Sequence, residues 1–184
     1  MISGPRLVRQ FYARDALTVA PDLLHKVLVA GPCTGRIVEV EAYRADDPAS
    51  HSFRGRTARN ATMFGPPGGL YVYFTYGMHF CANVVTGAEG DGQAVLLRAV
   101  HPITGVALMR QRRGDRPDRR LADGPAKLCQ AFGLDRDDDG RDLATDATVT
   151  IVDDGVPVPP ARTSARVGIR VGTEHEWRWC PADS

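Results

Sequence analysis

The chain has 184 residues, 43% of them hydrophobic, and this size and composition fit one compact domain with a sizeable core. A formal net charge of +1 excludes a uniformly basic nucleic-acid binder, although an average can hide opposed local patches. The sequence opens with no basic leader before an apolar run and contains no apolar stretch long enough to span a bilayer, so we expect a soluble, cytoplasmic protein.

Cysteine and arginine usage add two constraints. The four cysteines form no Cys-x-x-Cys pair and no histidine is placed to complete a zinc site, so they are typical of buried or free thiols in a reducing compartment. Only two of the 23 basic residues are lysine, which genomic base composition explains more simply than function does. Arginine is nevertheless suited to bind phosphates, because its planar guanidinium can donate two parallel hydrogen bonds to phosphate oxygens.

The first part of the chain predicts two short helices and two strands. The helices are expected at Arg6–Ala13 and Pro21–Lys26 and serve as scaffold. The strands are expected at Val27–Ala30 and Gly35–Arg44, around the turn Gly31-Pro32.

The second of these strands carries two glutamates and an aromatic residue. Period-two alternation places Val38, Val40 and Ala42 on one face. The other face receives Ile37, Glu39, Glu41 and Tyr43. Two interpretations stay open at this point: a half-buried strand with a polar outer face, or a catalytic base beside a stacking ring.

A long polar loop and a hairpin follow. Segment Ala45–Pro67 is too long for a simple turn, and loops of this length are often functional. Aromatic and β-branched residues on both sides of Tyr76-Gly77 predict a β-hairpin over Gly69–Thr86. One of its faces receives Tyr71, Tyr73 and Thr75. The tip carries an apolar pair, Tyr76 and Met78, which either folds back onto the domain or is a wedge offered to a partner.

The next strand, Gln93–Val100, is apolar except for Arg98, and we expect Pro102 to end it. A charge in such a run lies either at the solvent face of the sheet or turned into a site. Helices are then expected at Thr104–Arg113 and Pro125–Phe132.

The remaining part of the chain predicts closing strands at Val149–Val152 and Ala165–Val171. The aspartate-rich loop Asp135–Asp142 lacks the closing bidentate glutamate of a calcium loop. We therefore expect no metal and no organic cofactor.

With these segments in view, the chain resembles the 3-methyladenine DNA glycosylase family of the alkyladenine type, in order from about Val19 to Ile169. The motifs that carry the resemblance are Glu39-Val-Glu41-Ala-Tyr43, His51-Ser-Phe-Arg-Gly-Arg-Thr-Ala-Arg-Asn60, Met63-Phe, Leu70-Tyr-Val-Tyr-Phe-Thr-Tyr-Gly77-Met, Asn83, Leu96-Leu-Arg98-Ala and Gly124-Pro-Ala-Lys-Leu-Cys-Gln130. Several long motifs in one order are far more specific than any isolated pattern.

The resemblance implies an α+β fold: a single domain over residues 1–184, built on a mostly antiparallel curved sheet with a protruding β-hairpin and surrounded by short helices. The tail from about residue 172 departs from the family pattern and looks shortened or atypical, which we expect to affect stability more than chemistry. We also expect a monomer.

The implied activity is hydrolysis of the bond between deoxyribose and a damaged purine, such as 3-methyladenine, 7-methylguanine or hypoxanthine, in double-stranded DNA. A base inside a duplex cannot be reached, so the nucleotide must be flipped out. Tyr76 matches the wedge that fills the gap, assisted by Met78 and His79.

The same resemblance assigns the pocket. Tyr43, His51 and Tyr73 match the residues on which the flipped base stacks. Asn83 matches the residue that contacts the exocyclic amino group of guanine and thereby excludes this base. Glu41 matches the catalytic base that would activate a water. Arg98 and the carbonyl of Val167 match the groups that hold this water. Glu39 receives no role. Phosphate contacts are expected from Arg54, Arg56, Arg59 and Lys127.

We expect no lyase activity, because no lysine is placed as an amine nucleophile toward the sugar. Two other classes of function stay open from the sequence. One is a non-catalytic module that binds DNA lesions with the same wedge and pocket. The other is an RNA-binding or scaffold domain that uses only the basic loops.

Overall fold

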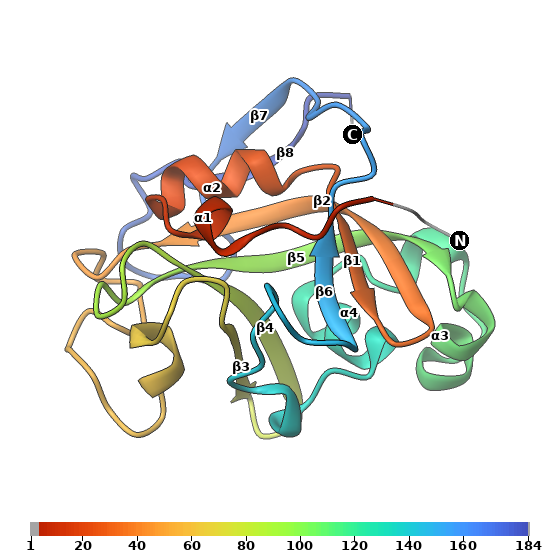
Figure 1. Ribbon diagram of the computed structural model, residues 1–184, viewed down its shortest axis with the longest axis horizontal. Coiled ribbons are helices and arrows are strands. Elements are labelled where there is room, and N and C mark those ends of the chain that lie inside the picture. Colours follow the sequence, from red (N-terminus) through yellow and green to blue (C-terminus); the bar gives the residue numbers. More distant parts are fainter. Residues whose placement is uncertain (1–3, 184) are drawn as a thin grey trace.

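The computed structural model describes residues 4–183. A curved antiparallel sheet in the order β3-β4-β5-β2-β1-β6 forms its centre, and β7 and β8 attach to it through β2 (Figure 1). The strands are β1 (Val27–Ala30), β2 (Cys33–Tyr43), β3 (Leu70–Thr75), β4 (His79–Thr86), β5 (Gln93–Thr104), β6 (Val149–Val152), β7 (Ala161–Ser164) and β8 (Arg178–Pro181). The α+β class with a mostly antiparallel sheet is confirmed.

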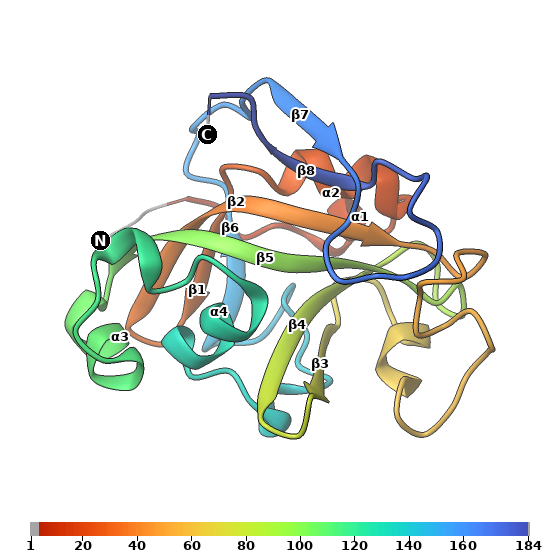
Figure 2. The same ribbon diagram turned by 180° about the vertical axis from the view of Figure 1, so that it is seen from behind.

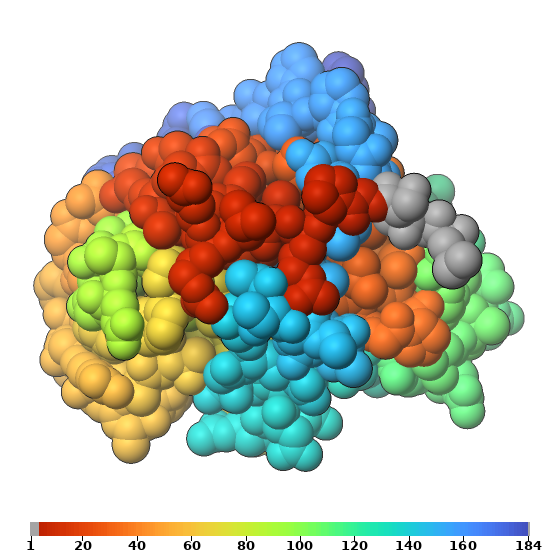
Figure 3. Space-filling model, in the orientation of Figure 1, coloured from red at the N-terminus to blue at the C-terminus, as the bar shows by residue number. Residues whose placement is uncertain are grey.

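Short helices cover the sheet from both sides. They are α1 (Arg9–Tyr12), α2 (Ala16–Leu23), α3 (Val106–Arg113) and α4 (Pro125–Phe132), with single 3-10 turns η1 (Ala61–Phe64), η2 (Asp118–Arg120) and η3 (Arg136–Asp138). Helices α1 and α2 lie in front of the sheet in Figure 1, whereas α3 and α4 lie in front of it in Figure 2. The N-terminal segment covers much of the first face (Figure 3). Within residues 4–183, every helix is too short or too polar to cross a bilayer.

Helix α2 begins earlier than the sequence pattern predicted. The side chain of Asp15 accepts a hydrogen bond from the Leu17 amide at 2.9 Å and caps the helix at Ala16. Pro21 lies inside the helix rather than at its start, so the prediction of a helix over Pro21–Lys26 is wrong. Proline removes one helical hydrogen bond, and burial of the apolar face outweighs that loss here. The face consists of Ala16, Val19, Ala20 and Leu23.

Two irregularities in the pairing of β2 with β5 decide which residues face the core. The register shifts between Ile37 and Glu39 and again between Glu39 and Val40, which leaves Val38 on β2 and Arg98 on β5 without a direct partner. A β-bulge re-aims the side chains around it. Ile37 therefore joins Val40 in the core, and the prediction that it shares a face with the glutamates is wrong.

Strand β5 continues to Thr104, so the prediction that Pro102 ends it is also wrong. Pro102 pairs with Gly35 at a third register shift, where the missing N–H of proline interrupts no regular ladder.

Of the two closing strands predicted near the end of the chain, the structure contains one. Val149–Val152 is a strand as predicted, but Ala165–Val171 is irregular, because the Val167 amide donates to a side chain instead of to a neighbouring strand. The strands that close this region are β7 and β8, which pair with each other. All four cysteines are buried and free, as predicted.

Candidate active site

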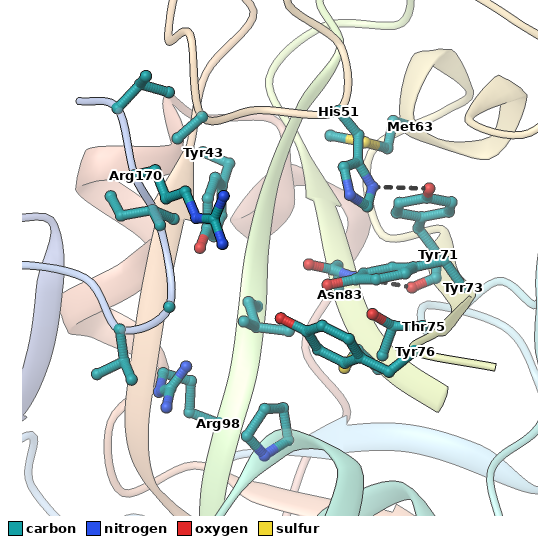
Figure 4. Close-up of a pocket in the computed structure, with 18 of the residues that line it drawn as sticks. Tyr43, His51, Met63, Tyr71, Tyr73, Thr75, Tyr76, Asn83, Arg98 and Arg170 are labelled. Atoms are coloured by element: carbon teal, nitrogen blue, oxygen red, sulfur yellow. Dashed lines mark hydrogen bonds between the residues drawn. The ribbon is translucent and has the colours of Figure 1, made fainter. Parts of the chain in front are cut away.

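A cavity of about 410 Å³ opens beside β3, the end of β2 and the segment 167–171. Its volume lies within the usual range of small-molecule sites, about 300–1,000 Å³. Figure 4 shows His51 and Tyr73 on one side of the cavity and Tyr43 and Arg170 on the other. The predicted site residues that line it are Tyr43, His51, Tyr73, Tyr76, Asn83, Arg98 and Val167.

The wall from β3 is aromatic because alternate residues of this strand face the cavity while Leu70 and Val72 face the core. The Tyr73 ring lies 4.5 Å from the His51 ring and 5.5 Å from the Tyr71 ring, measured between centroids. The Tyr71 hydroxyl also lies 3.1 Å from His51 Nδ1. His51 packs edge-on against both tyrosine rings, and the two tyrosine rings stack on each other, so each ring fixes the position of its neighbours.

The opposite wall is Tyr43, and a buried ion pair supports it from behind. The guanidinium of Arg166 lies 4.6 Å from the centre of the Tyr43 ring and 5.1 Å from that of Trp177. The same guanidinium pairs with Asp47, and both side chains are fully buried. Arg166 Nη1 also donates to the Ala42 carbonyl at 3.0 Å, which ties the support to β2.

Glu41 is fully buried behind the cavity lining, where it contacts the lining residues Tyr43, Arg98 and Val167. Its Oε1 accepts from the Val167 amide at 2.8 Å and lies 3.2 Å from Arg98 Nη1. Its Oε2 accepts from the Tyr43 hydroxyl at 2.8 Å. Burial, together with the negative charge of Glu41, raises the pKa of Tyr43, so this hydroxyl stays a donor at neutral pH. A buried carboxylate is tolerated only with such partners.

The bulge turns Arg98 into the site, which resolves the alternative left by the sequence. Its side chain is only 12% exposed, and its Nε donates to Glu39 Oε1 at 2.7 Å. Burial alone would raise the pKa of Glu39, but hydrogen bonds from Arg178 and Arg98 hold it below its ordinary value. The tail, expected to matter mainly for stability, thus places Arg178 Nε 2.6 Å from Glu39.

The loop that carries His51 is organised by a buried asparagine. Asn60 Nδ2 donates to the His51 carbonyl at 2.8 Å and to the Gly55 carbonyl at 3.1 Å. Burial, with a smaller contribution from the charge of Arg59, lowers the pKa of His51. The imidazole is therefore neutral at neutral pH and places no positive charge against a base in the cavity.

The hairpin tip projects from the molecule. Tyr76 is 84% exposed and Met78 69% exposed, so the tyrosine does not fold back onto the domain. Both Tyr76 and Gly77 have positive φ, 50° and 69°, and such a conformation is unusual for a bulky residue. Backbone strain of this kind is often found at functional sites. His79, the next residue after Met78, is also exposed.

The predicted phosphate contacts lie outside the cavity lining. Arg54, Arg56 and Arg59 are exposed on the loop before η1, and Lys127 on α4 pairs with Asp123 at 2.8 Å.

The sequence reasoning missed several residues that build the site: Asp47, Asn60, Tyr71, Arg166, Arg170 and Arg178. Tyr71 had a usable signal, because it shares the alternation of Tyr73. Asp47, Arg166 and Arg178 act through partners more than 100 residues away along the chain, which no local pattern reveals.

Comparison with known proteins identifies the chain. The model of the methylpurine-DNA glycosylase family matches residues 10–184. The chain belongs to this family. The DNA glycosylase class expected from the sequence, a hydrolase of N-glycosyl bonds, is thereby confirmed.

Relatives of this glycosylase in several bacteria carry the name of 3-methyladenine DNA glycosylases. A protein of Burkholderia lata is 54% identical over 96% of this chain and 87% of its own length. One of Carboxydothermus hydrogenoformans is 48% identical over 94% of this chain and 93% of its own length. One of Streptomyces avermitilis is 50% identical over 97% and 90%, respectively.

Proposed function

We propose that this glycosylase removes 3-methyladenine, 7-methylguanine and hypoxanthine from double-stranded DNA in base excision repair. The observation that carries the proposal is the buried Glu41 carboxylate, which is bonded to three residues of the cavity lining, Tyr43, Arg98 and Val167. Tyr43 lies on one side of this cavity, and His51 and Tyr73 lie on the other (Figure 4). Aromatic rings on both sides of the cavity can contact a purine, and a cationic alkylated purine gains about 0.5–2 kcal/mol from an aromatic face.

Glu41 would act as the base that activates water. A carboxylate offers about four lone-pair sites, and the Val167 amide, Arg98 and the Tyr43 hydroxyl engage three of them. The remaining site would accept a proton from water as the purine departs, while the negative charge stabilises the oxocarbenium-like sugar. The Val167 carbonyl and Arg98 would help to hold that water.

Asn83 would exclude undamaged guanine. It is 5% exposed, and its Nδ2 donates to the Tyr71 carbonyl at 3.2 Å, which sets the orientation of the amide. The exocyclic amino group of guanine would then meet a clash or an unmet hydrogen bond. Specificity in this pocket is therefore partly a matter of rejection.

Access to the base requires flipping, and the exposed Tyr76 would fill the gap with help from Met78 and His79. Arg54, Arg56, Arg59 and Lys127 would contact phosphates without reading sequence. The site is assembled from one chain, and we expect a monomer.

The test is the release of free base from duplexes that differ only in the damaged purine. Wild type should release it, Glu41→Gln should not, and Glu89→Gln, which removes a charge from an exposed loop, should behave as wild type. Tight lesion binding by wild type without release would instead indicate a non-catalytic lesion-binding module.

The reaction should stop at the abasic site, because none of the described residues that line the cavity is a lysine. Borohydride trapping of a covalent adduct between protein and DNA would contradict this expectation.

A further inference from the structure

The segment from Arg166 to Gly172 forms an arch whose two ends are fixed. At the first end, Arg166 is held by Asp47 and the Val167 amide by Glu41. At the other end, the Gly172 carbonyl accepts from Arg166 Nη2 at 3.3 Å. Gly172 has φ of 66°, and a Cβ there would approach Asp47 Oδ1 to 2.9 Å, so this end permits no larger residue without a shift. The arch therefore presents its middle residues in a defined place.

Arg170 is the charged residue at the middle of the arch. It is exposed, it lines the cavity, and Figure 4 shows its guanidinium directed into the cavity from the side of Tyr43. Arg98, the other cation of the lining, is paired with Glu39 and Glu41. Arg170 forms no hydrogen bond or ion pair with any residue between 4 and 183.

An unpaired guanidinium at the mouth of a site indicates an anionic ligand. In a DNA substrate the anions are phosphates, and the planar fork of arginine matches two phosphate oxygens. The arch also binds Glu41 through the Val167 amide. Arg170 therefore lies three residues along the same segment from the contact to Glu41, the carboxylate proposed to act at the sugar.

We propose that Arg170 binds a phosphate that flanks the flipped nucleotide, a phosphate subsite inside the damage pocket. The proposal rests on the proposed function, because it requires a nucleotide in the cavity. It differs from the predicted contacts of Arg54, Arg56 and Arg59, which lie outside the lining. One anchored segment would thus orient the carboxylate and clamp the backbone of the same nucleotide.

The charge of the subsite has a consequence for cationic lesions. A free guanidinium would repel an alkylated, positively charged purine that stacks on Tyr43. A phosphate bound to Arg170 offsets that charge, so cationic and neutral lesions should depend on Arg170 to a similar extent.

The experiment combines protein and DNA variants in the Glu41→Gln background, which keeps the substrate intact. Duplexes carry one hypoxanthine, with a neutral methylphosphonate replacing the phosphate on its 5′ side, on its 3′ side, or at neither. Binding of each duplex is measured for the parent and for Arg170→Ala and Arg170→Lys over a range of salt concentrations. Base release by the corresponding Glu41 proteins is measured separately with hypoxanthine and 7-methylguanine.

We expect Arg170→Ala to weaken binding about 10-fold and to reduce the salt slope by about one phosphate contact, with Arg170→Lys in between. One methylphosphonate should weaken the parent by a similar factor and leave Arg170→Ala unchanged. Additive losses at both flanking positions would overturn the proposal. So would a change in the ratio of 7-methylguanine to hypoxanthine release, which would place Arg170 at the edge of the base.

Failure of the proposed function gives a different result. In that case, wild type with Glu41 releases no base from any duplex. The methylphosphonate comparison would still decide whether Arg170 meets a phosphate, because it measures binding alone.

Discussion

Substitution of Glu39 by glutamine tests how the buried charges around Glu41 work together. Glu39 Oε1 accepts from Arg98 Nε at 2.7 Å and from Arg178 Nε at 2.6 Å. Glutamine keeps the size and the acceptor oxygen but removes the charge. The change therefore weakens the hold on Arg98 without opening a cavity.

The expected magnitude follows from these two bonds. A hydrogen bond to a charged partner contributes about 1.5–3 kcal/mol and a neutral one about 0.5–1.5 kcal/mol, so each bond should lose about 1 kcal/mol. The free energy of unfolding of Glu39→Gln should therefore fall by about 2 kcal/mol. If the weaker hold on Arg98 raises the activation free energy of base release by about 1–2 kcal/mol, single-turnover base release should slow roughly 5- to 30-fold.

The assay pairs chemical denaturation with single-turnover kinetics, and Glu89→Gln serves as the control for loss of one negative charge. Hydrogen bonds from Arg178 and Arg98 hold the pKa of Glu39 below its ordinary value of about 4.5 in the folded protein. The contribution of Glu39 to stability is therefore complete above about pH 4.5 and disappears as the pH falls through the folded pKa. Wild type and Glu39→Gln should thus converge in stability under acidic conditions. Equal base-release rates at neutral pH, or a stability difference that grows on acidification, would refute the reasoning.

Three other substitutions follow from the site. Arg166→Met should lower the free energy of unfolding by about 3–5 kcal/mol, because Asp47 is left buried without its partner, and a loss below 1 kcal/mol in denaturant titration would contradict the buried pair. Burial lowers the pKa of His51 below its ordinary value of 6.5 in the folded protein. As the pH drops below about 6.5, the unfolded chain binds a proton at His51 more readily than the folded protein does, so wild-type stability should fall. His51→Gln should lose this part of the pH dependence, and an unchanged profile would show that His51 does not titrate as proposed. Tyr76→Ala should keep the wild-type melting temperature, since the side chain is 84% exposed. Relative to wild type, its rate of base release should fall more on a duplex than on a single strand, and equal losses on both would argue against a wedge.

Local patterns in the sequence were sufficient for the hairpin and for one wall of the pocket. Period-two alternation placed Tyr73 toward the cavity and Leu70 toward the core, because successive residues of a strand point to opposite faces. Glycine at position 77, with φ of 69°, supplied the tight turn between β3 and β4. These features depend on neighbours in the chain and can be read without the fold.

The difference between Glu39 and Glu41 could not be read in that way. Alternation made the two equivalent, and the family resemblance gave a role to Glu41 alone without a physical reason. The tertiary structure supplies that reason: Glu41 meets the Val167 amide and the Tyr43 hydroxyl, whereas Glu39 meets two arginines. The bulges in β2 and β5 reset the faces of the strand, and the partners lie up to 139 residues away. A side chain's role is decided by such distant contacts because a buried charge is tolerated only where partners surround it.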